Sequence, residues 1–87
     1  MEEYVLARFS KKTGRVDYIL EGISAAMLKI WALRNTTKTK NTIIFSKVTG
    51  DVICLVRGTS DFPKVEKESL GNIENYCKGL LSYVQDN

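Results

Sequence analysis

The chain of 87 residues contains no histidine. Histidine is the commonest general acid or base in enzymes and the commonest metal ligand, so its absence removes the simplest catalytic and metal-binding designs. The glycines stand singly rather than in a phosphate-binding pattern, and no serine has a base at a recognisable spacing. We therefore expect a protein that is not an enzyme and that holds no cofactor.

Cysteine, proline and long apolar runs are also scarce. Cys54 and Cys77 are too few and too far apart for a disulfide scaffold or a zinc site, so we expect two buried thiols and no metal. The apolar runs are a few residues long, far short of the roughly 20 residues that span a bilayer. The acidic start, Met1-Glu2-Glu3, does not resemble a signal peptide. These features predict a cytoplasmic protein without a membrane partner.

What the chain does contain is an internal repeat. Residues 9–22 read FSKKTGRVDYILEG and residues 45–58 read FSKVTGDVICLVRG, with seven of fourteen aligned pairs identical at a shift of 36 positions. Such repetition predicts two copies of one small unit, about residues 4–36 and 40–87. Because the chain is too short for two independent cores, we expect both units to form a single domain, residues 1–87.

Each copy of the repeat predicts a β-hairpin, because apolar residues alternate with polar ones on both sides of a glycine-containing turn. A four-residue turn at residues 11–14 places Phe9 opposite Val16 and Ala7 opposite Tyr18, with the apolar side chains on one face. A three-residue turn would instead place Phe9 opposite Asp17. The pattern therefore favours the four-residue turn in both hairpins.

A helix is expected after each hairpin. The first spans about residues 24–35, with Ser24 as its N-cap. The apolar stripe that we expect it to bury comprises Ile23, Met27, Leu28, Ile30, Trp31 and Leu33. The stripe expected for the second helix comprises Ile73, Tyr76, Cys77, Leu80, Leu81 and Val84. Its start is left open between Asp61 and Ser69.

The expected fold class is α+β with duplicated ββα units in the order ββαββα. A four-stranded, mainly antiparallel sheet with two helices packed on one face buries both helical stripes and the inward face of every strand. A parallel sheet with alternating helices is the alternative, and the tight hairpin turns argue against it.

The sheet face opposite the two helices would meet water, yet five of the residues expected there are aliphatic. They are Leu6, Ile19, Ile44, Ile53 and Leu55. An exposed apolar patch marks an interface, although single exposed aliphatic side chains are common on any protein. Our leading hypothesis is a small protein-interaction or regulatory module that dimerises or binds a protein partner through this face.

Two other segments give competing hypotheses. The basic segment 29–40 suits phosphate contacts, which would make the protein a nucleic-acid-binding regulator. Its contacting residues would be Lys29, Arg34, Lys38 and Lys40. Against this, Tyr18, Phe9 and Phe45 are expected to point inward, which leaves few aromatic rings for stacking on bases.

The two copies of the repeat differ after Gly58, where residues 59–68 form an insertion. Its apolar residues Phe62, Pro63 and Val65 are a third hypothesis, a loop that contacts a partner. The alternative is that Phe62 and Val65 only cover the open end of the core.

Overall fold

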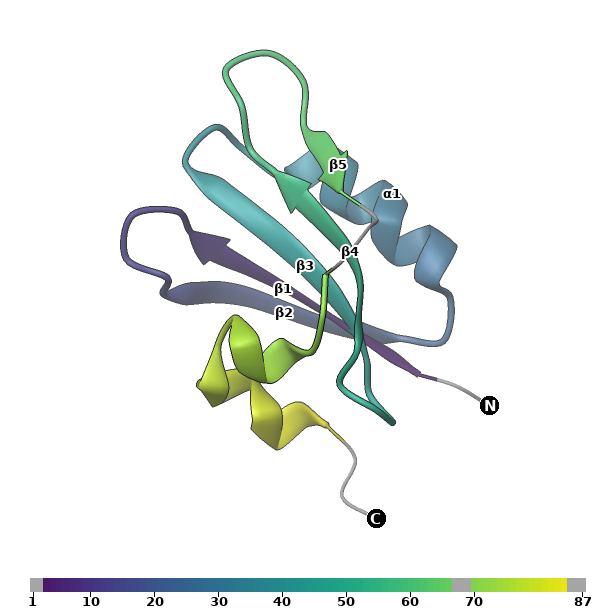
Figure 1. Ribbon diagram of the computed structural model, residues 1–87. Helices are drawn as coiled ribbons and strands as arrows, with labels where there is room; N and C mark the ends of the chain where they lie inside the picture. The colour runs from purple at the N-terminus through teal and green to yellow at the C-terminus, as the bar shows by residue number, and fades with distance from the viewer. Residues whose placement is uncertain (1–2, 67–69, 85–87) are drawn as a thin grey trace.

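The protein forms an antiparallel five-stranded sheet in a computed structural model that describes residues 3–66 and 70–84 (Figure 1). The elements are β1 (Tyr4–Ser10), β2 (Val16–Gly22), α1 (Ala25–Asn35), β3 (Lys40–Ser46), β4 (Val52–Arg57), β5 (Lys64–Glu66) and two short 3-10 helices, η1 (Ile73–Asn75) and η2 (Lys78–Tyr83). The strand order is β2-β1-β3-β4-β5, so β2 and β5 are the edges. The expected four-stranded ββαββα arrangement with two helices on one face is therefore wrong.

The two hairpin turns are built alike, and the four-residue turn is confirmed. In the first, Ser10 Oγ accepts hydrogen bonds from the N–H groups two and three residues ahead, and Ser10 O accepts one from Gly14 N at 2.8 Å. Ser46 and Gly50 make the same bonds in the second turn. Gly14 and Gly50 have φ values of 74° and 78°, a left-handed conformation that glycine adopts without steric cost.

Each hairpin also contains a β-bulge that the sequence pattern did not reveal. Phe9 lies opposite Val16 as expected, but Arg8 lies opposite Tyr18, which leaves Asp17 as an extra residue. The second hairpin has its bulge 36 positions later, at Ile53. A bulge inserts one residue and therefore reverses the face to which all later side chains of the strand point.

The bulge in β2 overturns the expected pairing of Ala7 with Tyr18. Ala7 lies opposite Ile19, and Ile19 packs on the same side of the sheet as Ala7. Tyr18 and Leu20 are turned to the side that α1 covers, where Leu20 packs against the cluster that contains Leu28. Tyr18, expected in the core, is exposed on that side.

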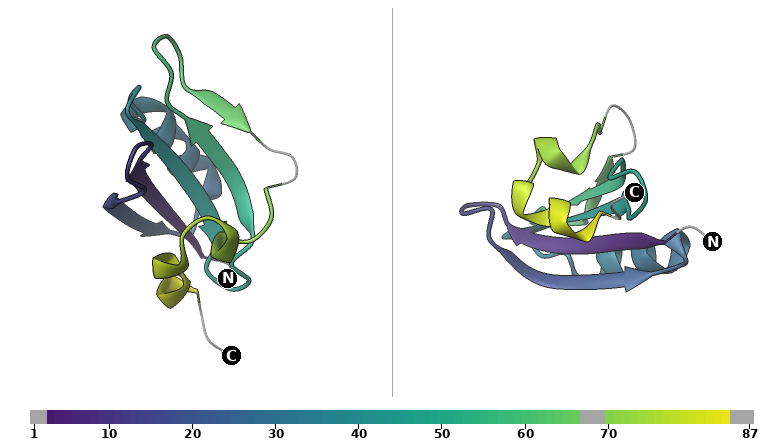
Figure 2. Two further views of the ribbon diagram at one scale, coloured as in Figure 1. Left: turned by 60° about the vertical axis from the view of Figure 1, so that its left-hand side comes forward. Right: turned by 90° about the horizontal axis from the view of Figure 1, so that it is seen from below.

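The sheet is covered on both faces rather than one (Figure 2). On one face, α1 encloses a cluster of Leu6, Leu28, Ala32, Ile44, Cys54 and Val56. On the other face, residues 70–84 enclose a second cluster of Val5, Ala7, Ile43, Phe45, Val52, Leu55, Leu70, Ile73 and Leu80. The backbone of this segment is also tied to the second hairpin, because Ile73 N donates to Gly50 O and Val52 N donates to Gly71 O.

The expected second helix is replaced by η1 and η2. Ile73 and Leu80 are buried and Cys77 is half-buried, so the expected stripe does include the residues that face the core. The backbone nevertheless leaves the helical conformation at Cys77, which has φ −152° and ψ 106°. Gly71 and Gly79 lower the helix propensity of the segment by about 1 kcal/mol each relative to alanine. The proposed start at Ser69 lies outside the described residues.

Candidate functional site

The apolar patch expected on the outer face of the sheet is not at the surface. Leu6 and Ile44 are completely buried beneath α1, and Leu55 is buried beneath the C-terminal segment. Ile19 and Ile53 are half-buried against the same two clusters. The hypothesis of an exposed sheet face is wrong, because both faces of the sheet are interior surfaces.

Helix α1 presents apolar side chains to solvent instead. Its N-cap is Ser24, as expected, with Ser24 Oγ accepting a hydrogen bond from Met27 N at 3.3 Å. Only Leu28 and Ala32 of the helix are buried. Four residues that were expected to line the core are instead 43–64% exposed: Ile23, Met27, Ile30 and Leu33.

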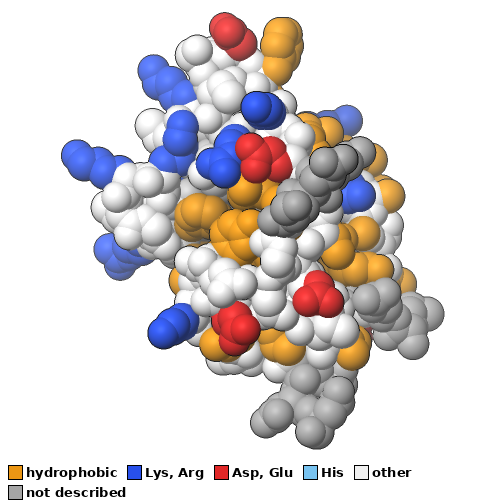
Figure 3. Space-filling view, in the orientation of Figure 1, with side chains coloured by type: hydrophobic (Ala, Val, Ile, Leu, Met, Phe, Trp, Pro, Cys, Tyr) orange, Lys and Arg blue, Asp and Glu red, His pale blue; other side chains and the backbone are white. Residues whose placement is uncertain are grey.

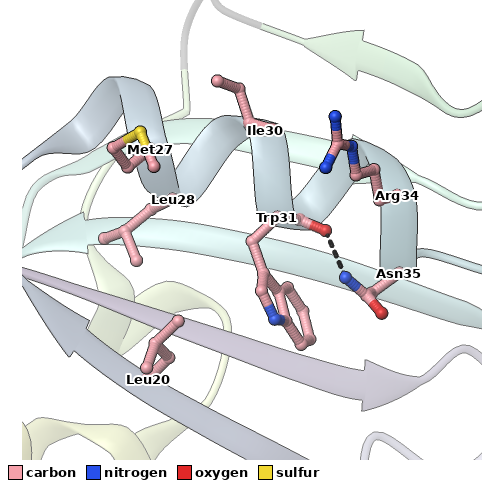
Figure 4. Close-up of a pocket in the computed structure, with 7 residues that line it drawn as sticks. All are labelled: Leu20, Met27, Leu28, Ile30, Trp31, Arg34 and Asn35. Atoms are coloured by element: carbon pink, nitrogen blue, oxygen red, sulfur yellow. Dashed lines mark hydrogen bonds between the residues drawn. The ribbon is translucent and has the colours of Figure 1, made fainter.

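Part of this exposed stripe borders a groove of about 340 Å³ between α1 and β2 (Figure 4). The residues that line this α1–β2 groove are Leu20, Met27, Leu28, Ile30, Trp31, Arg34 and Asn35. Figure 4 shows the Trp31 and Leu28 side chains directed from α1 toward Leu20 on β2, whereas Ile30 points away from the sheet. The groove therefore has an apolar floor at the edge of the sheet, and among the described residues Arg34 is the charged one that lines it.

A cluster of aromatic and charged side chains holds the wall of the groove in place. The rings of Tyr18 and Trp31 stack with centroids 4.5 Å apart and planes 13° apart. The guanidinium carbon of Arg8 lies 6.0 Å from the Tyr18 ring centroid and 5.8 Å from that of Trp31. Arg8 also donates two hydrogen bonds to the Asp17 carboxylate and one to Asn35 O, at the end of α1. Arg8 thus joins β1, the bulge in β2 and the helix.

The bulge residue Asp17 is the electrostatic partner in this cluster. The hydrogen bond from Arg8 is the main cause that holds the pKa of Asp17 below its usual range, and Lys40, 3.2 Å away, acts in the same direction. Sequence reasoning missed these roles, because the expected register placed Arg8 and Asp17 on the sheet face away from the helices and Tyr18 inside the core. Since the bulge depends on backbone pairing, no sequence pattern pointed to this cluster.

One end of the molecule is basic. Lys and Arg side chains gather where the turn 11–14 and the loop 36–39 lie (Figure 3). Lys11 Nζ donates hydrogen bonds to Lys38 O and Gly58 O, which joins three loops at this end. Four exposed cations at or next to the basic end form no ion pair with any other described residue: Lys12, Arg15, Arg34 and Lys38.

The residues expected to contact nucleic acid are thus only partly available. Arg34 and Lys38 are exposed, Lys29 is half-buried, and the Lys40 side chain pairs with Asp17.

In the insertion after Gly58, the side chain of Phe62 is 84% exposed. Pro63 is half-buried, and Val65 belongs to β5, where it lies opposite Val56. The expected partner loop is therefore divided between a projecting loop and an edge strand.

Comparison with protein-family models, curated proteins and solved structures finds no match for this chain. Within residues 3–66 and 70–84, no three His, Cys, Asp or Glu residues are grouped as metal ligands would be. No helix in the same part of the chain has the length and apolar character needed to cross a membrane.

Proposed function

We propose that the protein is an interaction module that binds a protein partner through the α1–β2 groove. The observation that carries this proposal is the exposure of Met27 and Ile30 beside Trp31, where a helix of a small domain would normally bury its large apolar residues. The sequence had predicted a protein-binding surface on the outer face of the sheet, and the surface proposed here is the α1–β2 groove instead.

The composition of the groove supports a protein ligand. Aromatic residues, methionine and arginine are enriched in protein interfaces, and Trp and Arg dominate their binding energy. The α1–β2 groove contains Trp31, Met27 and Arg34. Trp31 is held by its stack with Tyr18 and by Arg8, so little side-chain entropy would be lost when a partner binds.

Helix α1 offers a matched pair of residues for a test. The Ile30 and Leu33 side chains are 44% and 43% exposed, but only Ile30 lines the groove. The wild type and the Ile30→Glu and Leu33→Glu variants would each be immobilised and exposed to an extract of cells that contain the protein naturally. Bound proteins would be identified by quantitative mass spectrometry, and each would be purified and titrated by calorimetry.

The expected result is a partner that the wild type and Leu33→Glu bind alike and that Ile30→Glu binds about tenfold more weakly or not at all. Circular dichroism would show that both variants fold, since both positions are on the surface. Equal binding by all three proteins, or equal loss in both variants, would disprove a role for the groove.

A second candidate function, nucleic-acid binding, is favoured by one specific observation. The bulge at Asp17 places Tyr18 on the α1 side of the sheet, where its ring stacks on Trp31 and the residue is 39% exposed, so part of an aromatic ring is accessible that the sequence had placed in the core. Binding of single-stranded DNA should then weaken with rising salt and in a Lys12→Glu, Lys38→Glu double variant, whereas Lys78→Glu, in η2, should leave it unchanged. Undetectable binding at low salt would eliminate this candidate.

A further inference from the structure

We propose that β2 is an acceptor edge, to which an extended segment of the partner protein adds as a further strand while its side chains enter the α1–β2 groove. This inference rests on the proposed function and specifies the shape and chemistry of the ligand. The partner segment would carry apolar side chains at alternate positions and a carboxylate at the end near Arg15 and Arg34.

The two edges of the sheet are unequal. The edge strand β5 has three residues, and its Lys64 forms no ion pair with a described residue; short edges that carry a free lysine resist pairing with other chains. The edge strand β2 has seven residues, and no described strand pairs with its outer side. In an antiparallel edge strand, about every second residue directs its N–H and C=O away from the sheet, where they can bind an incoming backbone.

The charged side chains of β2 do not protect it as they do in typical edge strands. Asp17 is bound by Arg8 and Lys40, which belong to the sheet itself. Glu21 lies 3.2 Å from Lys47 Nζ, and this contact is the main cause that raises the pKa of Lys47. Each carboxylate already has its counter-ion, so neither is left as an unpaired charge against an added strand.

The groove continues this edge on the side of α1. Leu20 of β2 forms part of its floor, and Met27, Ile30 and Trp31 of α1 line its helix side, with Trp31 directed toward the sheet and Ile30 away from it. A strand beside β2 would direct alternate side chains to the α1 face of the sheet, because strand side chains alternate between faces. Apolar side chains at those positions would cover the exposed surfaces of Met27 and Ile30.

Charge sets the chemistry of one end of the segment. Arg15 immediately precedes β2. Arg34 is next to Asn35, whose carbonyl accepts a hydrogen bond from Arg8, and Arg8 lies opposite Tyr18 near the start of β2. Both cations therefore lie toward the same end of the groove, and neither pairs with a described carboxylate. A carboxylate of the partner would find its complement there.

The probe is a displayed library of random segments of about ten residues, long enough for one strand. It would be selected on the wild-type protein and counter-selected on the Ile30→Glu variant. We expect enriched segments in which apolar residues alternate with polar ones and Asp or Glu occupies one end. Enrichment of amphipathic helical segments, or of basic ones, would overturn the proposal.

Backbone methylation separates strand addition from simple burial in the groove. Two versions of an enriched peptide would be made, with N-methyl groups on the odd or on the even residues, which leaves every side chain in place. We expect one version to lose at least about tenfold in affinity and the other to bind nearly as the parent does, because only one set of N–H groups faces β2. Equal affinity of the two versions and the parent would disprove strand addition but retain groove binding.

Two further outcomes are decisive. If no segment is enriched in a way that depends on Ile30, the groove does not bind peptides and the proposed function fails as well. If sedimentation equilibrium of the protein alone shows a dimer that Ile30→Glu dissociates and Leu33→Glu does not, a second copy occupies the groove and the partner segment is excluded.

Discussion

Gly58 and Gly22 occupy equivalent positions 36 residues apart, and the structure predicts opposite responses to the same substitution. A Cβ atom at Gly58 would lie 1.7 Å from Thr37 O and 2.3 Å from Lys40 O, both backbone atoms. A Cβ atom at Gly22 would lie 3.6 Å from the nearest atom, Leu28 Cδ2, an ordinary contact. The conflict at Gly58 cannot be relieved by rotating a side chain, so the backbone itself must move.

Moving the backbone would disturb the loops at the basic end, because Gly58 N donates to Asn41 Oδ1 at 3.0 Å and Gly58 O accepts from Lys11 Nζ. Overpacking typically costs 1–3 kcal/mol, and a clash with fixed backbone falls at the upper end, about 3 kcal/mol. A chain of 87 residues has a free energy of unfolding of about 4–13 kcal/mol, so Gly58→Ala removes a large fraction of it.

Urea denaturation followed by circular dichroism measures this difference. We expect the midpoint of Gly58→Ala to fall by about 1–3 M and its Tm by about 12–24 °C. Gly22→Ala should stay within about 1 kcal/mol of the wild type. Free energies of unfolding that agree within about 0.5 kcal/mol for the two variants would refute the packing described around Gly58.

Three further predictions concern acid stability, the sheet interior and the thiols. Because Arg8 lowers the pKa of Asp17 in the folded state, the ionised Asp17 carboxylate stabilises the folded protein. This stabilisation is complete above the pKa of Asp17 in the unfolded chain, about 3.9, and is lost as the pH falls through the lower pKa of the folded state. Asp17→Asn should therefore flatten the fall in the free energy of unfolding below about pH 4, measured by urea titration at each pH. Ile44→Asp should unfold the protein, because Ile44 is completely buried, and a folded circular dichroism spectrum would contradict this. A thiol reagent should modify the half-buried Cys77 in the native protein and Cys54 only after denaturation.

The local parts of the fold were predictable from the sequence because short-range contacts decide them. The Ser10 and Ser46 hydroxyl groups and the glycine four residues after each bind within one turn, so the same letters form the same turn twice. Ser24 likewise caps α1 through a contact three residues away. These elements were expected, and the structure confirms them.

The orientation of the apolar side chains was not predictable in the same way. The runs at residues 43–45 and 52–56 are nearly continuous in apolar residues, a pattern typical of strands that are buried on both faces. Reading them instead as one core face and one exposed patch assigned Ile44 and Leu55 to the surface. The continuous runs were the signal that could have corrected this interpretation.

The candidate site was the part least accessible to sequence reasoning. The spacing of apolar residues in α1 indicates which of them share a stripe, but not which stripe meets the sheet. Leu28 and Ala32 pack against it, and Met27 and Ile30 do not. Only the placement of α1 over β2 shows that the exposed residues border a groove.

The sequence by itself determined the two hairpins, their four-residue turns and the start of α1, since each depends on hydrogen bonds between residues close in the chain. Tertiary structure alone decided the bulges at Asp17 and Ile53, the pairing of β5, the covering of both sheet faces and the exposure of α1. These features depend on which distant segments pack together, and their energy is shared between residues far apart in the sequence. The α1–β2 groove belongs to this second group, because it exists only once β2 and α1 have been placed side by side.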